Sequence, residues 1–147
     1  MSRIAHKILL QLYNYKGTVH SYNKDITEAI KQFMTAVKIA KEVNMKTEVV
    51  NEYNYALLMA LKKDRLTYEP ILNEAFEYGY SFSDEDLKII NLSFIASTYL
   101  DKTYSLDSSK RDEISKRMSD LYGEDWQLST KELAAKLDAE YSLRNQK

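Results

Sequence analysis

The 147-residue sequence predicts an all-α protein made of antiparallel helical hairpins, and three observations support that fold class. Apolar residues recur at three- and four-residue steps, which is the period of an amphipathic helix. Three glycines and one proline are too few for a β-sandwich or barrel, which needs a turn about every 8–12 residues. Several segments begin with a capping signature. We expect about seven helices in a single domain over residues 1–147, arranged as a compact array or bundle.

The first helix is predicted over residues 2–16. Gly17 is well placed to end it in the left-handed conformation, and a polar connection over 18–24 should follow. The spacing of its apolar residues places them along one side of the helix. These residues are Ile4, Ile8, Leu12 and Tyr15.

The helix predicted over residues 25–43 is the centre of the fold. Asp25, with Glu28 three residues later, has the form of an N-cap and its reciprocal partner, and Asn44 should end the helix. Three alanines on its apolar face let a neighbouring helix come close, while Phe33 supplies bulk to the contact. The apolar face consists of Ile26, Ala29, Ile30, Phe33, Ala36, Val37 and Ala40.

Two further helices are predicted over residues 46–63 and 67–79. The first has a wide apolar face, and the cations at its end suit a helix C-terminus, where the helix dipole is negative. In the second, Thr67 can serve as N-cap and Pro70 lies in the first turn, where its missing N–H costs nothing. Gly79 should stop this helix.

One long helix is predicted over residues 84–102, with Ser83 and Asp86 as its capping signature. Its sequence is apolar nearly all round, which is typical of a helix with neighbours on two sides. Together with the 25–43 helix it is expected to be the most buried element. The only tryptophan, Trp126, should close the end of the core.

A charged helix is predicted from residue 108 to Gly123, and Ser129 with Glu132 should cap a last helix. The C-terminal third, 108–147, either folds back over the 84–102 helix or forms a separate appendage. The apolar surface of the 84–102 helix favours the first alternative. The residues expected to cover it are Ile114, Met118, Leu121, Leu133 and Leu137.

Composition argues against several functional classes. The chain has no cysteine, which excludes a disulfide framework and a thiolate metal site, and the cytoplasm is the expected compartment. The N-terminal stretch lacks the apolar run of a signal peptide, and no membrane span is expected. The net charge of −1 gives no general attraction to nucleic acid or to an anionic membrane.

Catalytic and metal-binding signals are thin. His6 and His20 are the only imidazoles, and their spacing matches neither a zinc pair nor a nucleophile and its base. The three glycines are isolated, so the sequence has no phosphate-binding loop. The acidic run 84–86 lies in a helix first turn, where carboxylates stabilise the positive end of the dipole. We therefore expect no enzyme activity, no metal and no cofactor.

Twelve tyrosines are the most distinctive feature of the composition. Tyrosine is favoured at binding surfaces because it offers a rigid, amphipathic contact, although AT-biased coding would enrich it equally. The leading hypothesis is a small soluble adaptor or inhibitor, from a bacterium or a phage, that binds another protein or peptide through a tyrosine-rich face. Self-association is left open. The candidate binding residues are Tyr13, Tyr15, Tyr22, Tyr53, Tyr55, Tyr68, Tyr78 and Tyr80.

Residues 10–40 resemble a tetratricopeptide repeat, and a fainter second copy extends the resemblance to residues 10–78. The spacing from Ala36 to Ala75 is 39 residues, whereas that family repeats at about 34. The resemblance implies helical hairpins that bind a protein or peptide in a concave groove, without catalysis. The residues that carry it are Ala29, Phe33 and Ala36 in the second helix, with Tyr13 and Gly17 at the aromatic and small positions of the first.

The alternative hypothesis is a nucleic-acid-binding regulator that uses basic residues of the last third. Residues 129–137 resemble the opening helix of a helix-turn-helix, but Asp138 stands where the turn usually has glycine, and an ordinary capped helix explains the same pattern. Phosphate contacts would make such binding steeply salt-dependent. The candidate contacts are Lys110, Arg111, Lys116, Arg117, Lys131, Lys136 and Arg144.

Overall fold

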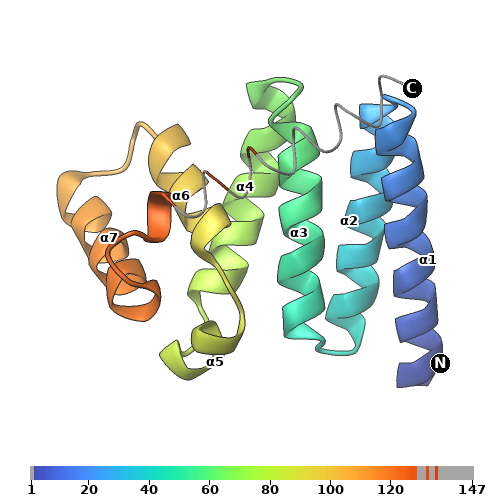
Figure 1. The fold of residues 1–147 in the computed structure, drawn as a ribbon, viewed down its shortest axis with the longest axis horizontal. Helices are drawn as coiled ribbons and strands as arrows, with labels where there is room; N and C mark the ends of the chain where they lie inside the picture. The colour runs from blue at the N-terminus through green and yellow to red at the C-terminus, as the bar shows by residue number, and fades with distance from the viewer. Residues whose placement is uncertain (1, 129–131, 133–134, 136–147) are drawn as a thin grey trace.

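The computed structural model describes residues 2–128, 132 and 135, and the helical fold class is confirmed for them, since they contain no strand. Seven complete α-helices lie in this part of the chain (Figure 1). Residues 126–128 are helical as well. The seven helices are α1 (Arg3–Tyr22), α2 (Ile26–Glu42), α3 (Lys46–Ala60), α4 (Arg65–Tyr80), α5 (Asp84–Ile89), α6 (Ser93–Lys102) and α7 (Ser108–Tyr122).

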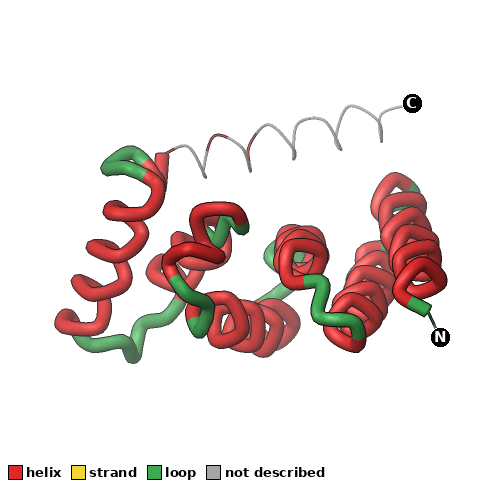
Figure 2. Tube along the Cα trace, turned by 90° about the horizontal axis from the view of Figure 1, so that it is seen from below, coloured by secondary structure: helices red, strands yellow, loops and turns green. Residues whose placement is uncertain are grey.

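The helices stand side by side in chain order, with α1 at one end of the row and α7 at the other (Figure 1). The principal contacts join α1 to α2, α2 to α3, α3 to α4, α4 to α6, and α7 to both α5 and α6. Viewed from below, successive helices alternate in height, so that α1 and α3 lie on one side of the array and α2 and α4 on the other (Figure 2). This arrangement is an array of hairpins in which each helix packs on its neighbours.

Helix α1 is longer than predicted, because Gly17 does not end it. Gly17 lies buried inside the helix, where a Cβ atom would stand 2.7 Å from Cε1 of Phe33 on α2. The predicted connection over 18–24 is correspondingly wrong, since only Asn23 and Lys24 separate the helix from the cap of α2. Lys24 adopts the left-handed conformation, with φ of 62°, that had been expected of the glycine. Gly17 thus permits close helix packing rather than a turn.

The central hairpin follows its sequence signals closely. The Asp25 side chain accepts a hydrogen bond from the Glu28 backbone N–H (3.3 Å), and Asn44 takes a φ of 55° after the end of α2. However, the most enclosed helix is α3, not the two predicted ones, because α2 and α4 pack on its opposite sides. Its buried apolar residues are Val49, Val50, Tyr53, Ala56, Leu57, Leu58, Met59 and Ala60.

Helix α4 begins and ends outside its predicted bounds. Asp64, rather than Thr67, is the N-cap, and its carboxylate accepts from the Thr67 backbone N–H at 2.9 Å. Pro70 lies in the interior of the helix instead of its first turn. Gly79 does not stop the helix: it is buried, and a Cβ there would stand 2.3 Å from Cδ1 of Leu92. The second glycine predicted as a helix stop is therefore also a point of close approach.

The helix predicted over 84–102 is two helices, α5 and α6. Ser83 caps α5 as predicted, since its hydroxyl accepts from the Asp86 N–H at 3.2 Å. The chain then turns, and the Asn91 side chain accepts from the Ser93 N–H at 2.9 Å. Tyr122 of α7 holds the break, because its hydroxyl accepts from the Leu92 N–H (3.1 Å). Not every apolar residue of this run is buried, since Ile89 at the end of α5 is 79% exposed.

Helix α7 closes the far end of the row. Ile114 and Met118 are fully buried against α5 and α6, and Leu121 packs beside them. The predicted burial of Trp126 is confirmed. Leu133 and Leu137, which were expected to complete this cover, lie outside the described residues, and so does the predicted cap Ser129.

Candidate functional site

The eight tyrosines predicted to form one binding face are dispersed over the array. Tyr53 is 0% exposed, so its assignment to a partner-binding surface was wrong. Its hydroxyl donates a hydrogen bond to Glu74 (2.7 Å) and accepts one from the Lys41 ammonium group (2.5 Å). Burial, followed by the neighbouring Glu74 carboxylate, raises the pKa of this phenol. Tyr53 therefore links α2, α3 and α4 inside the fold.

Tyr78 and Tyr80 are half-buried and take part in aromatic contacts within the protein. The Tyr78 ring centroid lies 6.0 Å from that of Tyr53, and burial raises the pKa of the Tyr78 hydroxyl. The Tyr80 ring stacks on Phe76 at 4.8 Å, and the Arg117 guanidinium group lies 4.7 Å from its centroid. The protein's own side chains hold both rings in place.

The other five tyrosines divide by exposure. Tyr13, Tyr22 and Tyr68 are half-buried, and the first and last of these pack against the core. Tyr15 on α1 and Tyr55 on α3 are exposed. The Tyr55 ring stacks on Phe33 with centroids 5.4 Å apart, so Tyr15, at 67% exposed, is the member of the predicted set that is most open to a partner.

Tyr15 belongs to a strip of apolar side chains along the outer side of α1, which we call the α1 stripe. Its members are between 36% and 74% exposed and follow each other at steps of four, four, three and four residues. The buried residues of this helix, including Leu10 and Gly17, lie on its opposite side, against α2. The α1 stripe consists of Ile4, Ile8, Leu12, Tyr15 and Val19.

The sequence spacing predicts that Ile4, Ile8, Leu12 and Tyr15 share one side of the helix. The period of an apolar strip shows that a helix has two unlike sides, and it does not show which side meets the rest of the protein. Here the inner side of α1 places the small residues Gly17 and Ser21 beside Leu10. The apolar strip on the other side of the helix is exposed.

Helix α1, which carries the stripe, has basic residues of its own. Arg3, Lys7 and Lys16 lie on α1, and the helix contains no acidic residue. At helical spacing Lys7 and Lys16 fall on opposite flanks of the stripe. The Lys16 ammonium group lies 4.9 Å from the centroid of the Tyr13 ring. A partner surface meeting the stripe would consequently meet cations on both sides.

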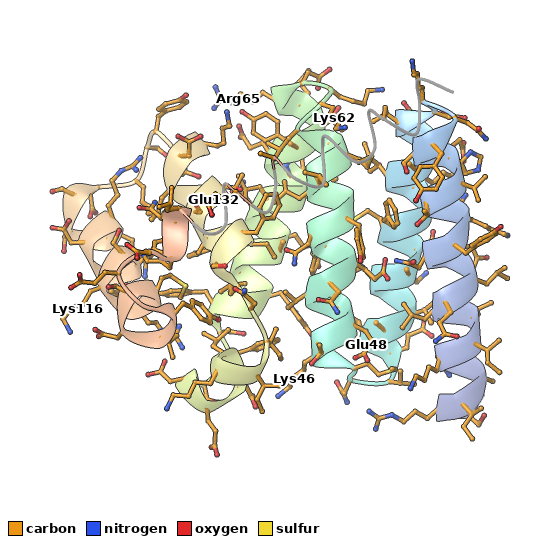
Figure 3. The ribbon with its side chains drawn as sticks, viewed as in Figure 1. Lys46, Glu48, Lys62, Arg65, Lys116 and Glu132 are labelled. Carbon is orange, nitrogen blue, oxygen red and sulfur yellow. The ribbon has the colours of Figure 1, made fainter. Side chains whose placement is uncertain are left out.

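A polar hollow of about 260 Å³ lies beside this region, between α1 and α3. Helix α1 contributes Gln11 and Asn14 to its lining, and α3 contributes Asn51 and Glu52. Glu48 also lines the hollow, and Figure 3 shows it near the beginning of α3. The sequence pattern does not predict that these residues meet, because they come from two helices that are separated along the chain by the whole of α2.

The basic residues proposed for nucleic-acid binding are largely engaged within the fold. The Arg111 guanidinium group donates to the backbone oxygens of Leu100 (2.6 Å), Leu106 (3.2 Å) and Thr103, which closes the end of α6. The Arg117 guanidinium group likewise donates to backbone oxygens at the end of α4, those of Tyr80 and Phe82. Lys110 pairs with Glu113 and Lys116 with Asp120. Lys131, Lys136 and Arg144 lie outside the described residues.

His6 and His20 lie on the same helix but contact different acids, Glu42 at 3.3 Å and Asp25 at 3.7 Å. Over the part of the chain that the structure describes, no three His, Cys, Asp or Glu side chains are grouped as a metal site would require. None of the helices described there combines the length and apolarity needed to cross a membrane.

Comparison with known proteins found no family model, no curated protein and no solved structure that matches this chain significantly. The resemblance to a tetratricopeptide repeat accordingly stays a prediction.

Proposed function

We propose that this protein is a non-catalytic adaptor or inhibitor that binds a partner protein through the α1 stripe. The observation that supports the proposal is the exposure of five apolar side chains on one helix side. Apolar residues exposed singly are normal, but soluble proteins rarely leave a continuous apolar strip uncovered unless it is an interaction site.

The spacing and charge of the stripe indicate the kind of partner. Steps of three and four residues match the seam on which a second amphipathic helix packs. Because α1 carries Arg3, Lys7 and Lys16 and no acid, a partner helix with glutamate or aspartate beside its apolar seam is complementary in charge. A second copy of α1 would bring like charges together, which disfavours pairing of two copies through this surface.

Two synthetic helical peptides test the proposal. Both have the same leucine seam, but one carries glutamates at the flanking positions and the other carries lysines. We expect the glutamate peptide to bind at least about tenfold more tightly in low salt, measured by fluorescence anisotropy, because opposite charges attract across the rim. Neither peptide has an acidic or basic residue within its seam, so the difference reports the flanks alone.

A double variant, Ile8→Gln with Leu12→Gln, should weaken binding of the glutamate peptide at least about tenfold, since it removes apolar area from the middle of the stripe. Leu66→Gln is the matched control, because Leu66 is an exposed leucine on α4, away from α1. Equal binding of the two peptides, or undiminished binding by the double variant, would contradict the proposal.

A further inference from the structure

The lining of the hollow between α1 and α3 includes a buried acidic group. Glu52 is 5% exposed, and the Asn14 amide donates to both of its carboxyl oxygens, at 2.7 and 3.1 Å. A carboxylate has about four acceptor sites, so this amide leaves acceptor capacity unused. Among the residues that the structure describes, no lysine or arginine forms an ion pair with Glu52. The group therefore lacks the charged partner that a buried carboxylate usually has.

The electrostatic state of Glu52 agrees with this geometry. Burial raises the pKa of its carboxyl to about 7, and the hydrogen bond from Asn14 offsets part of that effect. A cation placed against the carboxyl would stabilise the ionised form and remove much of the cost of burial. A positively charged group is therefore the ligand that this hollow should bind most favourably.

The lining of the hollow is consistent with a cationic guest. Glu48 stands one turn before Glu52 on α3, so two carboxylates are present against one cation, Lys7. Gln11 and Asn51 add amide oxygens that can accept further hydrogen bonds. The volume of about 260 Å³ lies below the roughly 300–1,000 Å³ of pockets that hold drug-sized ligands, and it suits a single side chain whose parent chain stays outside.

Guanidinium suits this lining better than ammonium does. It is planar, presents five N–H donors in a fixed fork and is more weakly hydrated, so it enters a partly buried acidic site at lower cost. Its paired N–H groups match the two oxygens of a carboxylate. Tyr55, whose ring stacks on Phe33 at 5.4 Å, also lines the hollow and adds aromatic surface, which attracts a guanidinium group.

We propose that the hollow between α1 and α3 binds an arginine side chain of a partner polypeptide, with Glu52 pairing with the guanidinium group. Asn14 positions the carboxyl, and Glu48 adds attraction at the rim. This site is separate from the proposed function, because it depends neither on the α1 stripe nor on the helix expected to bind there.

The test titrates the full chain with a blocked tripeptide, acetyl-Gly-Arg-Gly-amide. Binding is measured by NMR from the shifts of the side-chain amide signals of Asn14 and Asn51. The matched ligand contains citrulline in place of arginine, which keeps the shape and removes the charge. We expect the arginine peptide to bind at least about tenfold more tightly than the citrulline peptide, because charged hydrogen bonds are about twice as strong as neutral ones.

Glu52→Gln should lower the affinity for the arginine peptide at least about tenfold. Glutamine keeps the shape of the side chain and removes the buried charge, so this variant should fold, and circular dichroism checks that it does. Glu77→Gln, at an exposed position on α4, should bind as the unmodified chain does.

Equal affinity for the citrulline peptide, or full affinity in Glu52→Gln, would overturn the proposal. Agmatine binding as tightly as the peptide would also overturn it, by assigning the hollow to a small free cation. The Ile8→Gln, Leu12→Gln variant should retain its affinity for the arginine peptide. Failure of this proposal is therefore distinguishable from failure of the α1 stripe as a binding surface.

Discussion

The two halves of the array are held together by different means. In α1 to α3 the contacts are apolar and close: Gly17 lies against Phe33, and Ala36 and Ala40 of α2 are fully buried. In α4 to α7 polar side chains join distant helix ends. Arg117 and Tyr122, both on α7, bind backbone groups more than 25 residues away in the chain.

This difference shows two ways in which the unpaired backbone N–H and C=O groups at helix ends find hydrogen-bond partners. Where helices are long, as in the first half, fewer helix ends need a partner, and Ser2 and Asp25 cap α1 and α2 from positions next to them in sequence. Where helices are short, as α5 and α6 are, more ends occur per residue, and long side chains from elsewhere must reach them. The second half should therefore be the more sensitive to loss of a single polar side chain.

The largest expected effect comes from Arg117→Ala. The Arg117 guanidinium group donates to the backbone oxygens of Tyr80 (2.8 Å) and Phe82 (2.6 Å) and to Asp84 Oδ1 (2.9 Å). Hydrogen bonds to charged groups contribute about 1.5–3 kcal/mol each and are not fully additive, so the free energy of unfolding should fall by about 4 kcal/mol. Urea unfolding at pH 7 measures it.

Lys116→Ala is the matched control for this prediction. The Lys116 side chain is 81% exposed and points away from the array in Figure 3, and its partner Asp120 lies on the same helix. The control should change the free energy of unfolding by no more than about 0.5 kcal/mol. If Arg117→Ala lowered the free energy of unfolding equally little, hydrogen bonds from distant side chains to helix ends would not distinguish the two halves.

The next effect concerns Glu52, a buried carboxylic acid in the largely apolar interior of the first half. Because burial raises the pKa of its carboxyl from 4.5 to about 7, the folded state binds a proton that the unfolded state releases. The contribution of Glu52 is most favourable below pH 4.5 and is lost as the pH rises through 7. The cost above that pH is about 3 kcal/mol, from about 1.4 kcal/mol per pKa unit.

Glu52→Gln removes this cost, so its stability relative to the unmodified chain should rise by about 3 kcal/mol between pH 4.5 and pH 8, measured by urea unfolding at both values. Glu77→Gln, which changes an exposed glutamate on α4, should stay within about 0.5 kcal/mol at each pH. A Glu52→Gln effect that did not vary with pH would mean that the carboxyl is better solvated than its burial indicates.

The smallest effect tests the close approach of α1 and α2. In Gly17→Ala, the new Cβ would stand 2.7 Å from the ring of Phe33. This ring is rigid and buried, so it has little room to move away. Overpacking of this kind costs about 1–3 kcal/mol, against a gain of about 1 kcal/mol in helix propensity, so a net loss of about 1 kcal/mol is expected in thermal unfolding.

Gly79→Ala gives the corresponding measurement in the second half. Its new Cβ would meet a terminal methyl of Leu92, which can turn more readily than a ring, so the loss should be smaller than at Gly17. A Gly17→Ala protein more stable than the unmodified chain would show that the α1 and α2 contact is looser than described.

Much of the fold could be predicted from local pattern. The fold class, the caps at Asp25 and Ser83, the end of α2 at Asn44 and the burial of Trp126 all agree with the structure. Caps are predictable because the side chain and the backbone group that it serves lie within one helical turn. Apolar periodicity is predictable because it follows from the geometry of a single helix.

The candidate site was accessible to sequence reasoning only in part. The apolar spacing of the α1 stripe was recognised, but its exposure depends on which side of α1 meets α2, and that choice follows from the fit of Gly17 to Phe33. Tyr53 and Tyr15 look alike in sequence, yet one is fully buried and the other is exposed. Their difference arises from the neighbours of each helix, which composition does not specify.

Local sequence thus accounts for where most helices lie, because hydrogen bonds and caps act over three or four residues. It does not account for the break between α5 and α6, for the two glycines that admit close packing, or for the meeting of Asn14 with Glu52. Each of these depends on atoms that are brought together from distant positions: Tyr122 at Leu92, Phe33 at Gly17, and α1 beside α3. Such contacts form only when the whole array packs, because no single helix contains both partners.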